Sequence, residues 1–265
     1  MKRPAISVVV PARNEAERLG SNLRALFEAC AGWDVEVVVV DDASTDATAA
    51  IAEATVDGRG RVLRVERHRG KGAAVRAGVR ATRADRAVFF MDADLATDLE
   101  ALPRFVTALE EADIVVGSRV LDDAVVLDGK WYRAIMGRAF NVLARRAAST
   151  ELRDTQCGFK AFRGPVAHQL FGLARSDGYA FDVEVLLLAR HLELKVVELP
   201  VTWTAVSGSS VRPVADSFQM AVDAARIAFR WRSGRAPQQE RSPGATSTVG
   251  DGSATTAAAR KTLVV

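Results

Sequence analysis

The chain has 265 residues, of which 49% are hydrophobic and 26% charged, a composition typical of a globular protein with a substantial core. A net charge of +3 and an aromatic content of 6% do not favour a nucleic-acid binder. Two cysteines, Cys30 and Cys157, provide neither a disulfide framework nor a zinc site, which favours a reducing cytoplasmic location. The first residues lack the apolar run of a signal peptide, and no stretch reaches the roughly 18 apolar residues of a membrane span.

Short apolar runs alternate with helical patterns as far as Val116. We expect strands over Ala5–Val10, Val35–Val40, Arg61–Glu66, Val88–Met91 and Ile114–Val116. Between them we expect helices over Ala16–Ala29, from a Ser44 or Thr45 cap onward, from Gly72 to Thr82 and over Leu99–Glu111. This alternation predicts an α/β fold with a mostly parallel, doubly wound sheet.

The second half is less regular. The expected elements there are helices over Trp131–Ala147, Phe181–Leu192 and Asp216–Arg232, a strand ending at Phe162 and a strand over Val196–Val201. From Ser233 the composition shifts to Ser, Gly, Ala, Thr, Pro and Gln. We therefore predict one domain over residues 1–232 and a disordered, low-complexity tail over residues 233–265.

Two carboxylates directly follow the most apolar predicted strand. Asp92 and Asp94 are two positions apart, so they share a face at the carboxyl end of Val88–Met91, the edge where ligands bind in open α/β sheets. Anions this close repel each other unless a cation lies near them, and carboxylates with phosphate oxygens are the ligands that Mg²⁺ or Mn²⁺ prefers. The pair predicts a site for a metal and a diphosphate; by itself it is more typical of an acidic turn, so the surrounding residues decide.

Polar loops follow the other predicted strands as well. We expect these loops to meet Asp92 and Asp94 in one cleft; they are Pro11–Glu15, Asp41–Asp42 and Gly70–Lys71. In such a cleft, carboxylates would bind a base and a sugar, and a lysine would neutralise a diphosphate. Taken singly, these loops are also typical of a helix-capping turn and a basic turn. A Walker A motif, a Gly-x-Gly-x-x-Gly fingerprint and a Ser-His-Asp set are absent from the sequence.

The motifs carry a family resemblance. The segments Val10–Glu15, Val40–Asp46, Gly70–Gly72 and Asp92–Asp94 resemble family-two glycosyltransferases, inverting enzymes with the GT-A fold. Further similarity, to the dolichyl-phosphate β-glucosyltransferases and their bacterial polyprenyl-phosphate relatives, lies in Gly117–Arg119, Arg153–Lys160, Ala180–Glu184 and Trp203. The resemblance spans about residues 4–232.

The resemblance implies roles for individual residues. Residues expected to bind the donor, a UDP-sugar, are Pro11, Ala12, Glu15, Asp41, Lys71 and Asp92. Asp94, with Asp92, would hold a divalent cation, Mg²⁺ or Mn²⁺, that bridges the diphosphate. Arg119 and Arg133 would meet the acceptor phosphate, while Gln156, Asp182, Glu184 and Trp203 would line the sugar and acceptor side.

The implied reaction is transfer of glucose, with inversion, from UDP-glucose to a polyprenyl phosphate at the cytoplasmic face of the membrane. A phosphate monoester is largely dianionic at neutral pH, because its second pKa is about 6, and needs no general base. A hydroxyl acceptor would need one, and Asp182 or Glu184 is the candidate.

Three alternatives remain open: a polyprenyl-phosphate mannosyltransferase, a hydroxyl acceptor and a nucleotide-sugar binding protein without activity. Mannosyl-phosphate synthases of this group carry a Gln where this chain has Ala96, which weakens the first. Peripheral membrane contact is predicted through Trp131–Ala147 and Asp216–Arg232, which combine an apolar face with arginines; both are also typical of helices packed on a sheet.

Overall fold

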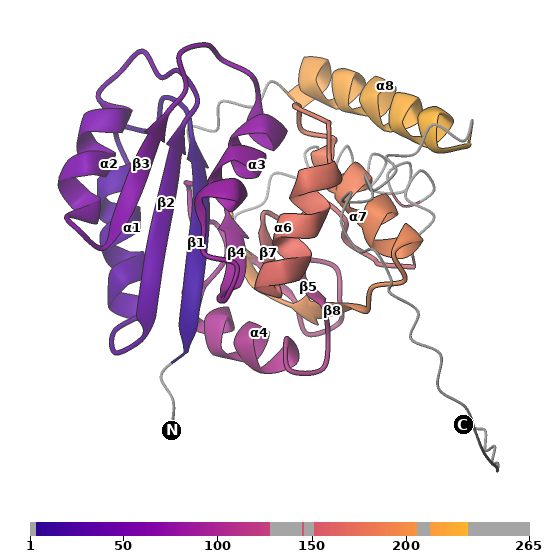
Figure 1. Ribbon diagram of the computed structural model, residues 1–265, viewed down its shortest axis with the longest axis horizontal. Coiled ribbons are helices and arrows are strands. Elements are labelled where there is room, and N and C mark those ends of the chain that lie inside the picture. The colour runs from indigo at the N-terminus through magenta and orange to yellow at the C-terminus, as the bar shows by residue number, and fades with distance from the viewer. Residues whose placement is uncertain (1–3, 128–144, 146–150, 206–212, 233–265) are drawn as a thin grey trace, which may run out of the picture.

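The structure is a computed structural model that describes residues 4–127, 145, 151–205 and 213–232. A seven-stranded sheet forms its centre, in the order β3-β2-β1-β4-β7-β5-β8 (Figure 1). Its strands are β1 Ala5–Ala12, β2 Asp34–Asp41, β3 Gly60–Arg64, β4 Ala87–Met91, β5 Ile114–Ser118, β7 Phe159–Phe162 and β8 Val196–Pro200. Neighbouring strands are parallel except at β7, which is antiparallel to both β4 and β5. A separate two-stranded ribbon pairs β6 Val125–Leu127 with β9 Thr202–Thr204.

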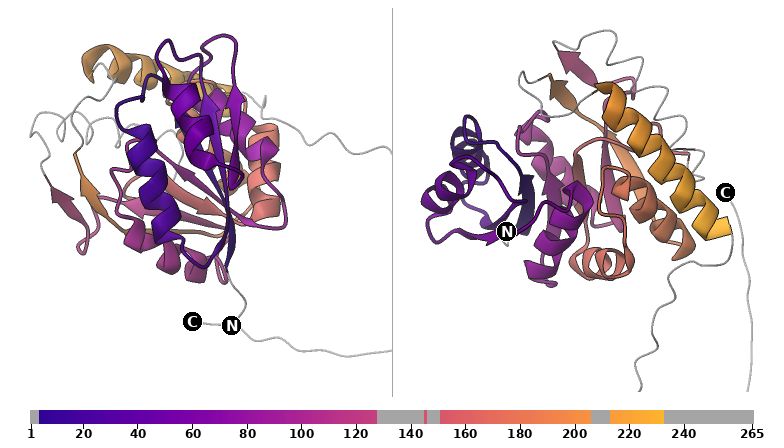
Figure 2. Two further views of the ribbon diagram at one scale, coloured as in Figure 1. Left: turned by 90° about the vertical axis from the view of Figure 1, so that its left-hand side faces the viewer. Right: turned by 90° about the horizontal axis from the view of Figure 1, so that it is seen from above.

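Helices cover both faces of the sheet. They are α1 Leu19–Ala29, α2 Thr48–Val56, α3 Lys71–Ala81, α4 Leu102–Ala108 with the short 3₁₀ turn η1 Leu99–Ala101 before it, α6 Gly164–Leu173, α7 Phe181–His191 and α8 Pro213–Arg232. Alternate residues of β1 enter different cores: Val8 and Val10 pack with α1, α2 and α4, whereas Val9 packs with α3, α6 and α7. Figure 2 shows α8 along the outer side of α7.

The strand order creates a crevice at one edge of the sheet. From β1 the chain moves outward to β2 and β3 and then returns to place β4 on the other side of β1. The order therefore reverses between β1 and β4, and ligands of open α/β sheets bind beyond the carboxyl ends of the strands at such a point. That edge faces upward in Figure 1, the side on which α8 lies.

The structure confirms the predicted fold class, a mostly parallel α/β sheet. Each predicted strand is present, with ends that differ by one or two residues. Three elements were not predicted: α6, β6 and β9. The Gly164–Pro165 pair looks like a helix breaker, but Pro in the first turn of α6 starts the helix instead.

Two further predictions need comment. Ser44 and Thr45 do not cap α2: its N-cap is Ala47, which makes no side-chain cap, and the Asp46 carboxylate before it accepts a hydrogen bond from the Thr48 backbone N–H at 2.9 Å. The predicted helix over Trp131–Ala147, apart from Arg145, and the tail over residues 233–265 lie outside the described residues. Within the described part, no helix has the length and apolar character needed to cross a bilayer.

Candidate active site at the carboxyl edge of the sheet

The ends of β1 and β2 lie side by side at the crevice. Ala12 is in register with Asp41, and the Ala12 carbonyl oxygen accepts a hydrogen bond from the Asp42 N–H at 2.9 Å. Asp41 is buried, and its Oδ1 atom finds no hydrogen-bond partner among the described residues. Because an unsatisfied buried acceptor is costly, Asp41 is suited to receive a hydrogen bond from a ligand.

Lys71 and Asp92 meet at the centre of the crevice. The Lys71 ammonium lies 2.6 Å from Oδ1 of Asp92 and 5.2 Å from the centre of the Phe90 ring. Burial alone would lower the pKa of Lys71, but the Asp92 and Asp182 carboxylates raise it above its ordinary value. The lysine therefore stays cationic, as a group that neutralises a diphosphate must.

Asp94 lies beside this pair, near the Asp92 carboxylate and the Lys71 and Arg18 cations. Burial, followed by the Asp92 charge, raises the pKa of Asp94. Burial also raises the pKa of Glu15, against the effect of Arg18, whose Nε lies 2.7 Å from the Glu15 carboxylate. A bound cation would relieve this repulsion.

The donor set fits a hard divalent cation only with help from a ligand. The described residues contain no group of three His, Cys, Asp or Glu side chains arranged to hold a metal. Asp92 and Asp94 would supply two carboxylates, so the other positions would fall to water and to phosphate oxygens, as is usual for Mg²⁺ and Mn²⁺.

A hollow opens between the end of β4 and the β6–β9 ribbon. Trp203 of β9 forms one wall, opposite Asp92 and Asp94, and bridges to Thr97 through the backbone. The remaining lining residues are Met91, Leu95, Ala96, Thr97, Gly158 and Phe159. The structure thus brings the predicted Trp203 to the same cavity as both aspartates.

Arg119 lies near Trp203, which lines the cavity, but is tightly bound to another side chain. Its Nε and Nη2 donate to the Asp154 carboxylate at 2.7 and 3.0 Å, and its guanidinium lies 5.7 Å from the centre of the Trp203 ring. Arg119 lowers the pKa of Asp154 in spite of its burial. The Arg119 guanidinium therefore has a fixed orientation, and its Nη1 atom takes no part in these two hydrogen bonds.

Asp182 forms a buried ion pair with a residue that the sequence analysis did not select. The Lys160 ammonium lies 2.8 Å from the Asp182 carboxylate and donates to the Cys157 carbonyl oxygen at 2.7 Å. Both side chains are almost inaccessible. Burial raises the pKa of Asp182, although Lys160 and Lys71 oppose this. A lysine within the apolar strand Phe159–Phe162 was the signal for a buried partner.

Glu184 lies apart from Asp182. Residues two apart on a helix face different directions, and the fully buried Glu184 carboxylate accepts hydrogen bonds from the Arg175 and Ser176 N–H groups at 2.8 and 2.6 Å. Its other oxygen lies 3.5 Å from Nη1 of Arg230 on α8. These contacts tie Glu184 to a loop, not to Asp92 or Asp94.

The remaining predicted site residues have mixed positions. Pro11 is the last residue but one of β1 and is in register with Val40 of β2. Gln156 follows Asp154 in the loop before β7, with its side-chain amide donating to the Thr155 carbonyl oxygen at 3.3 Å. Arg133 lies outside the described residues.

Asp42, named with Asp41 as part of the predicted cleft but without a role of its own, holds a turn. Its buried carboxylate accepts from the Arg69 and Gly70 N–H groups at 2.9 and 2.8 Å and contacts His68 at 2.7 Å. Adjacent residues at a strand end point to opposite faces of the sheet, so Asp41 and Asp42 have different contacts. Asp41 faces the crevice edge beside Ala12, while Asp42 holds the turn before Lys71.

Comparison with known proteins agrees with this geometry. Residues 7–171 match glycosyl transferase family 2. The chain is 34% identical over 247 residues to the dolichyl-phosphate β-glucosyltransferase of Dictyostelium discoideum, covering 86% of this chain and 75% of that one. The Drosophila melanogaster protein of the same name is 37% identical over 248 residues, covering 86% and 76%.

A solved structure shares the fold. Glucosyl-3-phosphoglycerate synthase from Mycobacterium tuberculosis, in complex with Mn²⁺, UDP-glucose and phosphoglyceric acid, superposes with a TM-score of 0.65 at 22% identity, covering 85% of this chain and 80% of that one. The likeness confirms the expected GT-A-like architecture. The chain belongs to glycosyl transferase family 2 and is a glycosyltransferase similar to the dolichyl-phosphate β-glucosyltransferases.

Proposed function

We propose that this enzyme transfers glucose from UDP-glucose to a polyprenyl phosphate, with inversion, at the cytoplasmic face of a membrane. The observation that carries the proposal is the Lys71–Asp92–Asp94 group at the β1/β4 crevice, a cation and two carboxylates in one place. The glucosyl donor and the lipid acceptor are supported by the names of the relatives, which are about a third identical over most of the chain.

The donor is held by residues of the crevice. Asp41 accepts a hydrogen bond from the base through its unsatisfied Oδ1 atom, and Pro11, Ala12 and Glu15 border the base and ribose. Lys71 neutralises the diphosphate and keeps Asp92 in place. A divalent cation bound by Asp92 and Asp94 would supply Lewis-acid stabilisation of the leaving diphosphate.

The acceptor approaches from the Trp203 side of the cavity. Arg119, fixed by Asp154, presents positive charge to the incoming phosphate, and Arg133 is proposed to assist it. A phosphate dianion attacks the sugar without a general base, so catalysis consists of positioning and charge neutralisation. The burial of Asp182 against Lys160 supports this account, because a carboxylate that is almost inaccessible is poorly placed to take a proton from an acceptor hydroxyl.

Membrane contact is proposed for α8. Phe229 is 72% exposed, and Arg226 on the same helix is also exposed, a combination that suits a helix lying in the bilayer interface. Flotation with liposomes containing anionic lipid tests this part: binding at low salt that is lost in Phe229→Ser supports it, and no binding at low salt contradicts it.

The reaction is tested with purified protein, radiolabelled UDP-glucose, a short polyprenyl phosphate and Mn²⁺. We expect a glucosylated lipid phosphate, lost on addition of EDTA and restored by excess Mn²⁺. GDP-mannose and a polyprenyl alcohol are the comparison donor and acceptor. Faster transfer from GDP-mannose would contradict the proposed donor, and faster transfer to the alcohol would contradict the proposed acceptor. Transfer that survives EDTA would refute the role of the cation.

A further inference from the structure

The turn that carries Lys71 is packed against a distant loop. A Cβ atom at Gly70 would lie 2.6 Å from the Asp177 carbonyl oxygen, and one at Gly72 would lie 2.5 Å from the Ser176 carbonyl oxygen. Gly70 also has φ = 108°, which only glycine adopts readily. The Ala73 N–H donates to the Asp177 carbonyl oxygen at 3.1 Å. The two glycines around Lys71 therefore admit the loop over residues 175–178, rather than an anion, to this turn.

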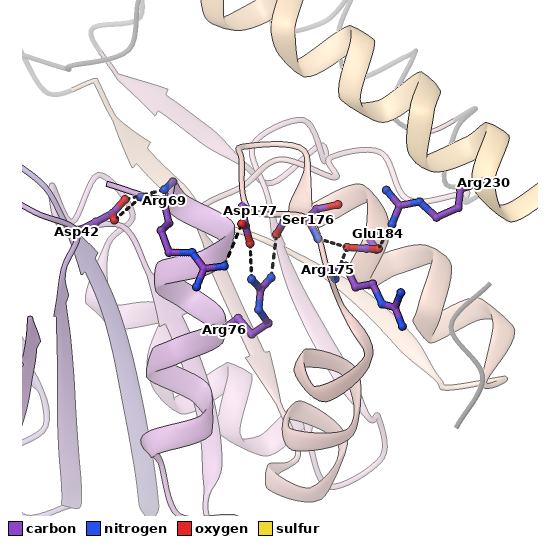
Figure 3. A network of polar contacts seen from close by, with 9 residues as sticks. Asp42, Arg69, Arg76, Arg175, Ser176, Asp177, Glu184 and Arg230 are labelled. Atoms are coloured by element: carbon purple, nitrogen blue, oxygen red, sulfur yellow. Dashed lines mark hydrogen bonds and ion pairs between the residues drawn. The ribbon is translucent and has the colours of Figure 1, made fainter. Parts of the chain in front are cut away.

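Side chains hold the same loop to α3 (Figure 3). The largely buried Arg76 donates to the Ser176 carbonyl oxygen at 3.1 Å and pairs with the Asp177 carboxylate. Arg69, two residues before Lys71, reaches the other Asp177 oxygen at 3.3 Å. Asp177 thus bridges two arginines that lie on either side of Lys71 in the sequence.

The opposite side of the loop is held by a buried carboxylate. Glu184 of α7 accepts hydrogen bonds from the Arg175 and Ser176 N–H groups (Figure 3). Neither carboxylate has a role in the proposed chemistry, although Glu184 is inaccessible to solvent and buried charges are costly. Both are engaged in fixing one loop between α3 and α7.

We propose that Asp177 and Glu184 are positioning residues for Lys71: they hold the loop over residues 175–178 against the first turn of α3 and so direct the lysine ammonium toward Asp92 and a bound diphosphate. The inference rests on the proposed function, which assigns Lys71 to the diphosphate. If the inference holds, Asp177 and Glu184 affect the binding of UDP only through their effect on Lys71.

Isothermal titration calorimetry with UDP and Mn²⁺ tests the inference. We expect Asp177→Asn to weaken UDP binding about tenfold, comparable to the loss of one charge-assisted hydrogen bond. Glu184→Leu should weaken it similarly, whereas Glu184→Gln, which keeps an acceptor for the two N–H groups, should bind nearly as the wild type does. Asp85→Asn, which disrupts an exposed ion pair with Arg83, is the matched control and should bind normally.

A double-mutant cycle separates positioning from general loosening of the structure. In a Lys71→Met background, Asp177→Asn should change UDP affinity less than about twofold, because the residue through which it acts is gone. Full additivity of the two changes, or normal UDP binding by Asp177→Asn alone, would overturn the inference and leave the proposed function standing. Absence of UDP binding by the wild-type protein would overturn both.

Discussion

Asp92 and Asp94 are only two positions apart, yet they have different surroundings. Asp92 faces the Lys71 ammonium at 2.6 Å, so much of its charge is balanced within the protein. Asp94 accepts a hydrogen bond from the Ala96 N–H at 3.2 Å, but burial and the Asp92 charge raise its pKa. At the scale of single residues, Asp94 is the carboxylate whose charge is left for a bound cation to balance.

Replacement of Asp94 by Asn should stabilise the protein while abolishing transfer. Because the folded-state pKa of Asp94 is raised, the ionised carboxylate disfavours folding above that pKa, and this penalty vanishes below the unfolded-state pKa of about 4. We therefore expect a higher Tm for the variant at about pH 7 and almost no difference at about pH 3. Thermal denaturation at both values, without divalent cation, checks this; a lower Tm at neutral pH would contradict it.

Lys160→Met should be strongly destabilising. The change leaves the Asp182 carboxylate buried without its partner at 2.8 Å, and breaking a buried pair on one side costs about 3–5 kcal/mol in free energy of unfolding. The double variant Lys160→Met with Asp182→Asn should recover part of this loss, because no unpaired charge remains. Urea denaturation measures both.

Arg64→Met is the control for that experiment, since it removes an exposed ion pair with Glu53 and should cost less than about 1 kcal/mol. Equal losses for the buried and the exposed pair would show that the Lys160–Asp182 contact is not an isolated buried ion pair.

At the scale of elements, β7 decides what surrounds Asp92. This antiparallel strand enters between β4 and β5 and brings the preceding loop beside the aspartate: the Asp92 N–H donates to the Gly158 carbonyl oxygen at 3.1 Å. A Cβ atom at Gly158 would clash with the Asp92 carboxylate. The segment from Asp154 to Lys160 therefore shapes the crevice beside Asp92 through its backbone.

Gly158→Ala should displace Asp92 and reduce transfer at least about 100-fold, since small misplacement of a catalytic group has effects of this size. Gly172→Ala is the matched control: a Cβ atom there meets no atom within 4 Å, and alanine in a helix is more favourable than glycine by about 0.5–1 kcal/mol. The control should retain activity with an unchanged or higher Tm. Full activity in Gly158→Ala would mean that the position of Asp92 does not limit the reaction.

The sequence predicts the strands better than the partners of charged side chains. Buried strands such as Val35–Val40 have a local signal, a run of β-branched residues, and their parallel direction follows from the alternation with helices. The grouping of Asp182 with Glu184 had no such basis, because helix rotation sends the two carboxylates to Lys160 and to the 175–178 loop. Pairs such as Arg119–Asp154 join residues 35 positions apart, and only the folded topology specifies them.

At the scale of the whole molecule, the crevice joins segments from both halves of the chain. The Arg13–Arg18 loop follows β1, the turn before Lys71 precedes α3, and Asp92–Ala96 follows β4, with the 175–178 loop behind α3. Each of these segments is a loop or a helix end, where backbone N–H groups exchange readily unless a ligand orders them. A ligand that fills the crevice must therefore contact separate parts of the chain at once.

Hydrogen exchange should record this on addition of UDP with Mn²⁺. We expect slower exchange in peptides covering residues 13–18, 69–73 and 92–97 together, because a nucleotide at the β1/β4 crevice touches or orders all three. The loop over residues 57–59, between α2 and the amino end of β3, lies at the opposite edge of the sheet; it is the internal control and should exchange at an unchanged rate. UDP without a cation should still protect residues 69–73, because the positive charge of Lys71 attracts the diphosphate. It should protect residues 92–97 more weakly, because without a cation Asp92 and Asp94 repel the diphosphate. Protection confined to one segment would place the nucleotide away from the crevice.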